Sequence, residues 1–255
     1  AIVASRPNWR AAMAAIPGLV RRGSLRWWQL LGGLGGAWLV TTQGLVVVVV
    51  GETIFTVGVV AGQVTGSLVV DRAGLSPAGH LAVTPHRIVA AAIALVAVAL
   101  SGLRAGDLHV HLSWVVILAV SAGLGIAVQQ AINGRVAVAT GQPLAATLVN
   151  FLVGFGGLLI ACAVGVGFGL ITFQHWPSQW WLYLGGPIGV LFIALAAWAV
   201  RGLGVLVFGL LSIAGQLLGS VILDTVAPTS VSALAWPQWV GLGLVAGAVV
   251  LASRR

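Results

Sequence analysis

Charged residues are scarce in this sequence of 255 residues. Only 6% of the positions are Asp, Glu, Lys or Arg, four positions are acidic, and there is no lysine. Soluble domains carry about 25% charged residues, whereas this chain is 60% hydrophobic with a mean hydropathy of +1.11. The scarcity of charge excludes an ordinary soluble protein and indicates an integral membrane protein.

Cysteine and catalytic motifs are also nearly absent. The single Cys162 lies in an apolar run, which excludes a disulfide framework and a cysteine-based metal site. His109 and His111 are too isolated to indicate a metal ligand set, and no Ser/His/Asp arrangement, Gly-rich phosphate loop or carboxylate pair stands in a suitable context. We therefore expect no catalytic residue, no metal and no cofactor.

What is present is a series of long apolar runs separated by Pro, Gly and nearly all of the charge. A hydrocarbon core about 30 Å thick requires about 20 apolar residues per helix. Residues 1–5 resemble the end of a further span, and segment 6–26 is either an amphipathic surface helix or a cytoplasmic connector. The complete spans that we predict are 27–48, 52–70, 86–103, 113–133, 143–166, 180–200, 203–223 and 236–252.

The arginines orient these spans. A formal charge of +8 would suit a nucleic-acid-binding protein, but the arginines lie between apolar runs and form no basic groove, so we expect no nucleic-acid partner. All of them except Arg104 fall on one side of the predicted membrane. This bias places the C-terminus in the cytoplasm.

The chain contains an internal duplication with an offset of 153 positions. Residues 27–71 match residues 180–224 without a gap, including Trp27 and Trp28 and the run Ala61-Gly62-Gln63, with identities at about one position in three. The chain crosses the membrane five times between Trp27 and Trp180, so the two copies point in opposite directions across the membrane. The sequence therefore predicts an all-α polytopic bundle of inverted repeats, as in many secondary transporters.

The repeat also predicts the domain organisation. Residues 1–112 form the first repeat and residues 113–255 form the second, which has five spans. If both repeats have five spans, the first lacks its first span and most of its second. We therefore expect a ten-span protein that is about 50 residues longer at its N-terminus, by comparison with its own second half.

Each copy carries a stripe of polar residues along one helix. Gln63 and Ser67 lie on one face of the span 52–70, and Gln216 and Ser220 are their counterparts. The stripes either face each other and line a polar path for a solute, or they tie helices together by buried hydrogen bonds. A ladder of small residues beside them predicts close helix packing and consists of Gly58, Gly62, Gly66, Gly215 and Gly219.

Further polar residues within spans are candidates for the same path. They are Thr42 and Gln43 in span one, Gln129 and Gln130 in span four, and Asn150 in span five. Asn133 in span four either belongs to this set or, as the motif Asn133-Gly134-Arg135 favours, forms a helix cap and turn at the end of the span. Trp38 lies inside span one and either contacts a cationic solute through its ring face or packs in the core.

Glu52 is the only glutamate. Acidic residues within a membrane are candidates for proton or ion coupling, but Glu52 also begins a span, where a helix N-terminus favours negative charge. Asp71 and Asp224 close their helices at the membrane edge and are interpreted as boundary or packing residues.

Several motifs resemble one known family. Gly123-Leu124-Gly125-Ile126-Ala127-Val128-Gln129, Pro143-Leu144-Ala145-Ala146 leading to Asn150-Phe151-Leu152-Val153-Gly154, and the two copies of Ala-Gly-Gln-x-x-Gly-Ser-x-x-x-Asp resemble the YdcZ-type branch of the drug/metabolite transporter superfamily. The resemblance implies two fused five-span units in a bacterial inner membrane and export of a small solute. Small multidrug exporters of that superfamily carry a glutamate on their first span, whereas span 113–133 has no acidic residue.

The favoured function is a secondary transporter that exports a small metabolite or an amphipathic or cationic solute by alternating access between the repeats. Its partners would be the lipid bilayer and the solute. The alternative is a channel-like or non-transporting membrane subunit that binds a partner through its Gly-rich helix faces. An enzyme has the least support, and the sequence sets no oligomeric state.

Overall fold

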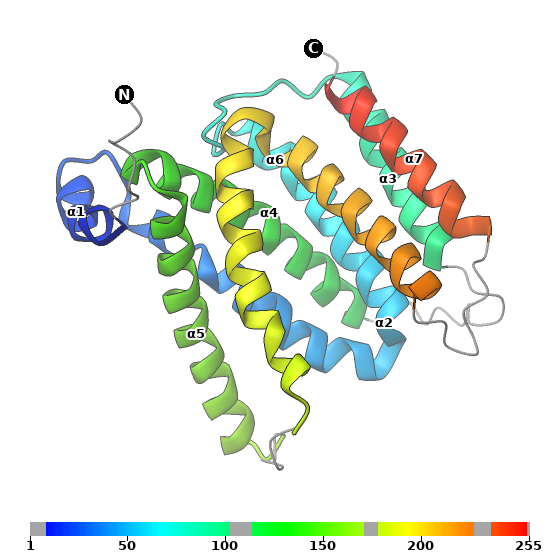
Figure 1. Ribbon diagram of the computed structural model, residues 1–255, viewed down its shortest axis with the longest axis horizontal. Coiled ribbons are helices and arrows are strands. Elements are labelled where there is room, and N and C mark those ends of the chain that lie inside the picture. The colour runs from blue at the N-terminus through cyan, green and yellow to red at the C-terminus, as the bar shows by residue number, and fades with distance from the viewer. Residues whose placement is uncertain (1–8, 103–113, 171–177, 227–235, 254–255) are drawn as a thin grey trace.

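A computed structural model describes residues 9–102, 114–170, 178–226 and 236–253, and within these ranges every regular element is helical. Figure 1 shows long helices packed side by side, with α1 at one edge and the pair of α3 and α7 at another. The all-α class is therefore confirmed. The elements are α1 Trp9–Arg21, η1 Trp27–Leu30, α2 Gly33–Arg72, α3 Pro85–Gly102, α4 Trp114–Thr140, α5 Pro143–Gly167, η2 Trp180–Leu184, α6 Gly185–Val226 and α7 Trp236–Ser253.

Helix α2 contains two membrane spans that run in opposite directions. The first arm, Gly33–Val50, is named α2a, and the second arm, Ile54–Arg72, is named α2b. Both arms lie along α4. Going along the chain from Gly32, just before α2, to Gly66 in α2b, the contacts with α4 are Gly32 with Asn133, Trp38 with Ser121, Gly58 with Ala119, and Gly66 with Ala127. The α4 numbers fall along α2a and rise along α2b, so the chain reverses between the arms, as Figure 1 also shows.

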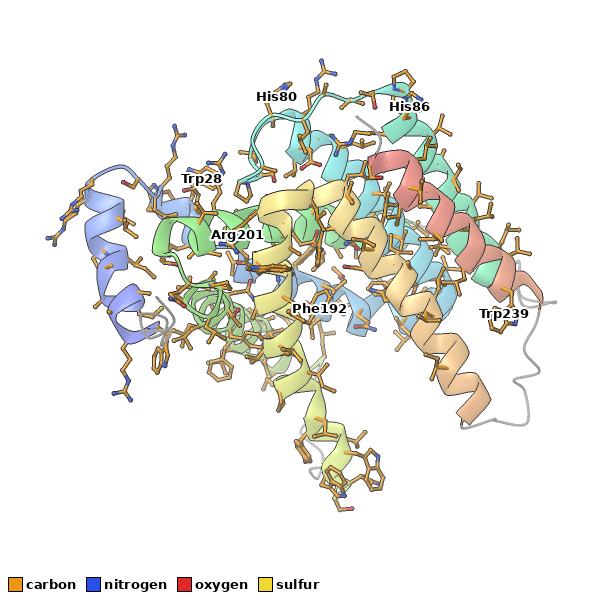
Figure 2. All side chains as sticks on the ribbon, turned by 45° about the horizontal axis from the view of Figure 1, so that its top comes forward. Trp28, His80, His86, Phe192, Arg201 and Trp239 are labelled. Carbon is orange, nitrogen blue, oxygen red and sulfur yellow. The ribbon has the colours of Figure 1, made fainter. Side chains whose placement is uncertain are left out.

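Helix α6 bends back on itself at Gly204. Gly204 has φ 76° and ψ 172°, a conformation that is accessible to glycine but strained for other residues. Phe192 and Phe208 lie on opposite sides of the bend, and their ring centroids are 6.2 Å apart. A straight helix would separate them by about 24 Å at 1.5 Å per residue. We name the arm 185–203 α6a and the arm 205–226 α6b; Phe192 on α6a is labelled in Figure 2.

Five segments of the described chain are long and apolar enough to cross a membrane, and two shorter apolar helices lie in α3 and α7. The bend at Gly204 divides the longest of these segments, Trp180–Gly219, into two arms. The resulting helical segments correspond one to one with the eight predicted spans. A polytopic helical membrane bundle is therefore the fold class of this chain.

The two copies of the repeat are inverted with respect to each other. Asp71 at the end of α2b contacts Val205 at the start of α6b, and the earlier residues Gln63 and Ser67 lie beside the later residue Gly209. The two helices are therefore antiparallel. The start of α3, at Arg87, and the end of α7, at Ser253, line one pocket, so these helices are also antiparallel. Both copies also begin in the same way, since each Trp-Trp pair forms a 3-10 turn, η1 or η2, before the helix.

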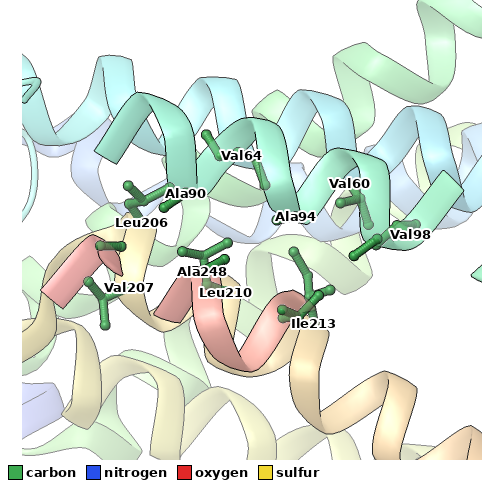
Figure 3. Packing of buried hydrophobic residues seen from close by; sticks show 14 residues of the cluster. Val60, Val64, Ala90, Ala94, Val98, Leu206, Val207, Leu210, Ile213 and Ala248 are labelled. Atoms are coloured by element: carbon green, nitrogen blue, oxygen red, sulfur yellow. The ribbon is translucent and has the colours of Figure 1, made fainter. Parts of the chain in front are cut away.

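The main hydrophobic core lies between α2b, α3, α6b and α7. Small residues dominate α3 and α7 in this core, which lets the helix backbones approach closely. Figure 3 shows the resulting interdigitation of the four helices. The cluster includes Val60, Val64, Ala90, Ala94, Ala97, Val98, Leu206, Leu210, Ile213, Val245 and Ala248.

One predicted boundary is wrong. Asn133 lies inside α4, which continues to Thr140, so Asn133 is not a cap at the end of span four. The helix ends instead before Gly141, which has φ 69° and provides the left-handed conformation common after a helix C-terminus. Segment 6–26 contains the helix α1, whose Ile16 packs with Leu25 and Val136.

Candidate functional site

Two buried glutamines on α4 form the centre of the candidate site. The side chains of Gln129 and Gln130 are 4% and 6% exposed. Within the described part of the chain, the Oε1 atom of each has no hydrogen-bond partner. A buried carbonyl oxygen without a partner costs about 1–3 kcal/mol, so these two acceptors are unusual and mark this part of α4 as the candidate site.

The backbone of α2a at Gly35 and Gly36 lies close to the side-chain amide of Gln129. A Cβ placed on Gly35 would lie 3.0 Å from Gln129 Oε1, and one on Gly36 would lie 3.2 Å from the same atom. Larger residues at these positions would cover the amide. The sequence around Gly35 and Gly36 therefore creates the space in which Gln129 lies.

Asn133 and Asn150 extend the polar layer one turn further along α4. Asn133 Nδ2 donates a hydrogen bond of 2.9 Å to Asn150 Oδ1, and both residues are buried. Asn150 therefore has a partner on a neighbouring helix. Asn133 therefore belongs to this layer and is not the helix cap that the sequence favoured, and its spacing of four residues from Gln129 places both on one helix face.

Gln63 and Ser67 on α2b lie against α6b. Both are buried, and Ser67 Oγ donates a hydrogen bond of 2.6 Å to the backbone carbonyl oxygen of Gln63. A Cβ on Gly209 would lie 3.5 Å from Gln63 Nε2 and 3.6 Å from Ser67 Oγ. These two predicted site residues therefore lie at the contact between the two repeats.

The polar stripe of the second copy, on α6b, differs from that of the first copy in its burial. Gln216 lies on α6b about two helical turns beyond Gly209, and its side chain is exposed, whereas its counterpart Gln63 is buried. The structure thus does not bring the two glutamines together. The side chains of Ser220 and Glu52 lie outside the described residues.

The polar residues of α2a have local roles. Thr42 is fully buried, and its Oγ1 donates to the carbonyl oxygen of Trp38 at 2.8 Å. Trp38 is 42% exposed, and its Nε1 donates to Ser121 Oγ of α4 at 2.9 Å. Gln43 is exposed. The bond between Trp38 and Ser121 ties α2a to α4.

The glycine ladder of the first copy packs closely against α4. A Cβ on Gly58 would lie 2.8 Å from that of Ala119, and one on Gly62 would collide with the carbonyl oxygen of Val120. Gly66 is similarly close to Leu124, at 3.0 Å. For Gly215 and Gly219, by contrast, no described atom lies within 4 Å of an added Cβ.

Asp71 connects the two repeats at the end of α2b. Its side chain is fully buried and pairs with Arg87, which is also buried. The carboxylate also accepts the backbone N–H groups of Val205 at 2.9 Å and Leu206 at 3.2 Å. Asp71 thereby satisfies two N–H groups at the start of α6b that lack a partner within the helix, in agreement with its interpretation as a packing residue.

Arg135 of α4 binds the segment that follows the C-terminus of α2. Its guanidinium donates to the carbonyl oxygens of Leu75, at 2.6 Å, and Gly74. These carbonyls follow the C-terminus of α2, where a cation is favoured. Arg135 therefore has a structural role in addition to the topological one that the sequence indicated. Within the described ranges, no group of three or more His, Cys, Asp or Glu residues could hold a metal ion.

Comparison with known proteins shows that the chain matches one protein family. Residues 4–100 and 114–251 match the family model DMT_YdcZ, described as "Putative inner membrane exporter, YdcZ". No curated protein and no solved structure matches the chain.

Proposed function

Because the chain belongs to the DMT_YdcZ family of inner membrane exporters, we propose that it is a secondary transporter that exports a small solute carrying hydrogen-bond donors. The protein is a multi-pass membrane protein, and its environment is the lipid bilayer. The solute class is a small metabolite or an amphipathic or cationic molecule. The C-terminus lies in the cytoplasm, in line with the distribution of arginine.

The observation that carries this proposal is the pair of buried amide oxygens on α4. Gln129 Oε1 and Gln130 Oε1 can only accept hydrogen bonds, and neither has a donor among the described residues. A solute with ammonium, amide or hydroxyl protons would supply those donors. An anionic solute would instead face two more acceptors, so we expect anions to be excluded.

Alternating access between the inverted repeats fits this location. Gln63 and Ser67 lie at the contact between the repeats, against Gly209, and sites near the interface of inverted repeats are common in secondary transporters. In the proposed mechanism, movement of α6b relative to α2b changes the side from which the solute reaches α4. Glu52 remains the candidate for proton or ion coupling.

Flux into proteoliposomes tests the proposal. A fluorescent organic cation and a neutral polyol are offered with and without a pH gradient. We expect saturable, gradient-dependent flux of at least one of them, and a decrease of about tenfold in Gln129→Met, which keeps the side-chain length. The matched control is Gln179→Met, an exposed amide outside the site. Equal flux in wild type and Gln129→Met would refute the assignment of the site.

The alternative, a channel-like or non-transporting subunit that binds a partner, is favoured by one observation. Gly215 and Gly219 form a small-residue face against which no described atom lies within 4 Å. Flux that does not saturate would indicate a channel. Absence of flux for every solute, with specific binding of a partner through this face, would favour the subunit.

A further inference from the structure

The turn between α1 and η1 carries three exposed arginines. Arg21 ends α1, Arg22 follows it, and Arg26 precedes η1, and the side chains of all three are exposed. We name residues 21–27 the basic turn. Its last residue, Trp27, is 67% exposed and begins the 3-10 turn that leads into α2a. Because exposed tryptophans at the ends of spans mark the membrane surface, the basic turn lies at that surface.

Backbone bonds and one buried side chain fix the shape of the basic turn. Gly23 has φ 74°, the left-handed conformation common after a helix C-terminus, and the N–H of Leu25 donates to the carbonyl oxygen of Leu19 at 3.2 Å. Leu25 is 1% exposed and packs with Val136 near the end of α4. Figure 1 shows α1 beside this end of the bundle. The three arginines are therefore attached to a well-defined backbone.

The chain supplies no acidic side chain to neutralise these arginines. It contains four acidic residues in all. Counted from the basic turn, Glu52 follows one span, Asp107 three and Asp224 seven, so the topology assigns all three to the other side of the membrane. The fourth, Asp71, is fully buried and pairs with Arg87. The basic turn thus needs its negative partner from outside the chain.

Backbone carbonyl oxygens do not take the place of a carboxylate. The guanidinium groups of Arg135 and Arg201 donate to such oxygens, those of Leu75 and Trp198. Within the described ranges, no hydrogen bond joins a guanidinium group of the basic turn to the rest of the protein. These three groups are therefore available to a ligand.

We propose that the basic turn binds the phosphate of an acidic phospholipid in the adjacent leaflet. Guanidinium groups offer paired donors that match phosphate oxygens, and clusters of basic residues beside a membrane span are typical sites for acidic lipids. A lipid is the source of the phosphate, because the basic turn lies at the surface where lipid headgroups are concentrated. This inference rests on charge and topology and is independent of the proposed transport activity.

Binding of labelled phosphatidylglycerol to the full chain tests the proposal. The purified chain in neutral detergent is titrated with phosphatidylglycerol that carries an acceptor fluorophore on one acyl chain, and energy transfer from the tryptophans is measured. We expect saturable binding that unlabelled phosphatidylglycerol reverses and phosphatidylcholine does not. The double variant Arg21→Gln/Arg22→Gln should bind about tenfold more weakly, and Arg26→Gln should also weaken binding.

The matched control removes the same charge outside the basic turn. Arg10 and Arg72 are also exposed, and the guanidinium of Arg10 lies 5.3 Å from the centre of the Trp9 ring. Arg10→Gln/Arg72→Gln should bind the lipid as the wild type does. Because all four side chains are exposed, both double variants should keep the wild-type unfolding midpoint in detergent. Raising the salt concentration from about 0.1 M to about 1 M should weaken wild-type binding.

Three results would overturn the proposal. They are equal affinity for phosphatidylglycerol and phosphatidylcholine, equal loss of affinity in the two double variants, and displacement of the labelled lipid by inorganic phosphate as effectively as by phosphatidylglycerol. The second result would assign binding to the overall charge of this side of the protein. The third would make a soluble phosphate the ligand.

Discussion

The carboxylate of Asp71 accepts a hydrogen bond of 2.9 Å from the backbone N–H of Val205, a residue 134 positions away in the sequence. This bond joins the last turn of α2b to the first turn of α6b, so one side chain holds the ends of two inverted helices together. Arg87 neutralises the same carboxylate from α3. Three helices thus depend on Asp71.

Replacing Asp71 should destabilise the protein strongly. Asp71→Asn leaves the buried guanidinium of Arg87 without a charged partner, and breaking one side of a buried ion pair costs about 3–5 kcal/mol. We expect a lower midpoint of thermal unfolding in detergent, measured by the fluorescence of the tryptophans. The exposed Arg72→Gln serves as the control. If Arg87→Leu added to Asp71→Asn did not recover part of the loss, the pair would not be the cause.

Gly204→Ala should also destabilise the chain. Gly204 has φ 76°, which strains any residue with a Cβ by about 1–3 kcal/mol, and the new Cβ would lie 2.6 Å from Leu81 Cδ1. Gly202→Ala, two residues earlier in open surroundings, is the matched control. Equal unfolding midpoints for the two variants would contradict the bend described for α6.

The two glycine ladders should respond differently to the same substitution. Gly62→Leu places a side chain into the backbone of α4 at Val120, whereas Gly215→Leu meets no described atom. We expect Gly62→Leu to abolish the monodisperse peak in size-exclusion chromatography and Gly215→Leu to retain it. Loss of the peak in both variants would mean that Gly215 is already packed.

The asparagine pair should show a measurable coupling energy. Asn133 and Asn150 form one interhelical hydrogen bond of 2.9 Å, and such bonds within membranes contribute about 0.6 kcal/mol on average, up to about 1.7 kcal/mol. A double-mutant cycle with Asn133→Ala and Asn150→Ala, followed by unfolding in sodium dodecyl sulfate, measures it. Strictly additive effects would show that the bond contributes nothing to stability.

Gln129→Met should stabilise the protein while it decreases transport. The substitution removes a buried acceptor without a described partner, a group that costs about 1–3 kcal/mol, and keeps the length of the side chain. A higher unfolding midpoint combined with lower flux is expected for a site residue. A lower midpoint would indicate that Gln129 has a structural hydrogen bond and would remove it from the candidate site.

Much of the fold could be predicted from the sequence because the membrane imposes strong constraints. Apolar runs of span length, Pro and Gly at the breaks and the offset of 153 positions gave the helices and their inverted relation. Small residues four positions apart indicate a helix contact, and Gly58, Gly62 and Gly66 lie against α4.

The errors arose where local patterns compete with contacts distant in sequence. Asn133-Gly134-Arg135 resembles the end of a span, yet α4 continues because Arg135 donates to the carbonyl oxygens that follow α2. The exposed position of Gln216 was not foreseen, because its counterpart Gln63 is buried against Gly209 of α6b, a contact distant in the sequence. The contact of Asp71 with Val205 joins residues in different repeats and leaves no local signal.

The close fit of α4 to both arms of α2 has a mechanical consequence. Helices that touch through glycine backbones have few internal degrees of freedom, so α2a, α4 and α2b should move as one rigid body. The bend at Gly204 lies outside this body, and the carboxylate of Asp71 attaches the start of α6b to it through the backbone N–H groups of Val205 and Leu206. Because α2 belongs to the first repeat and α4 to the second, this body spans both repeats, and α6b should move against it with Asp71 as the pivot.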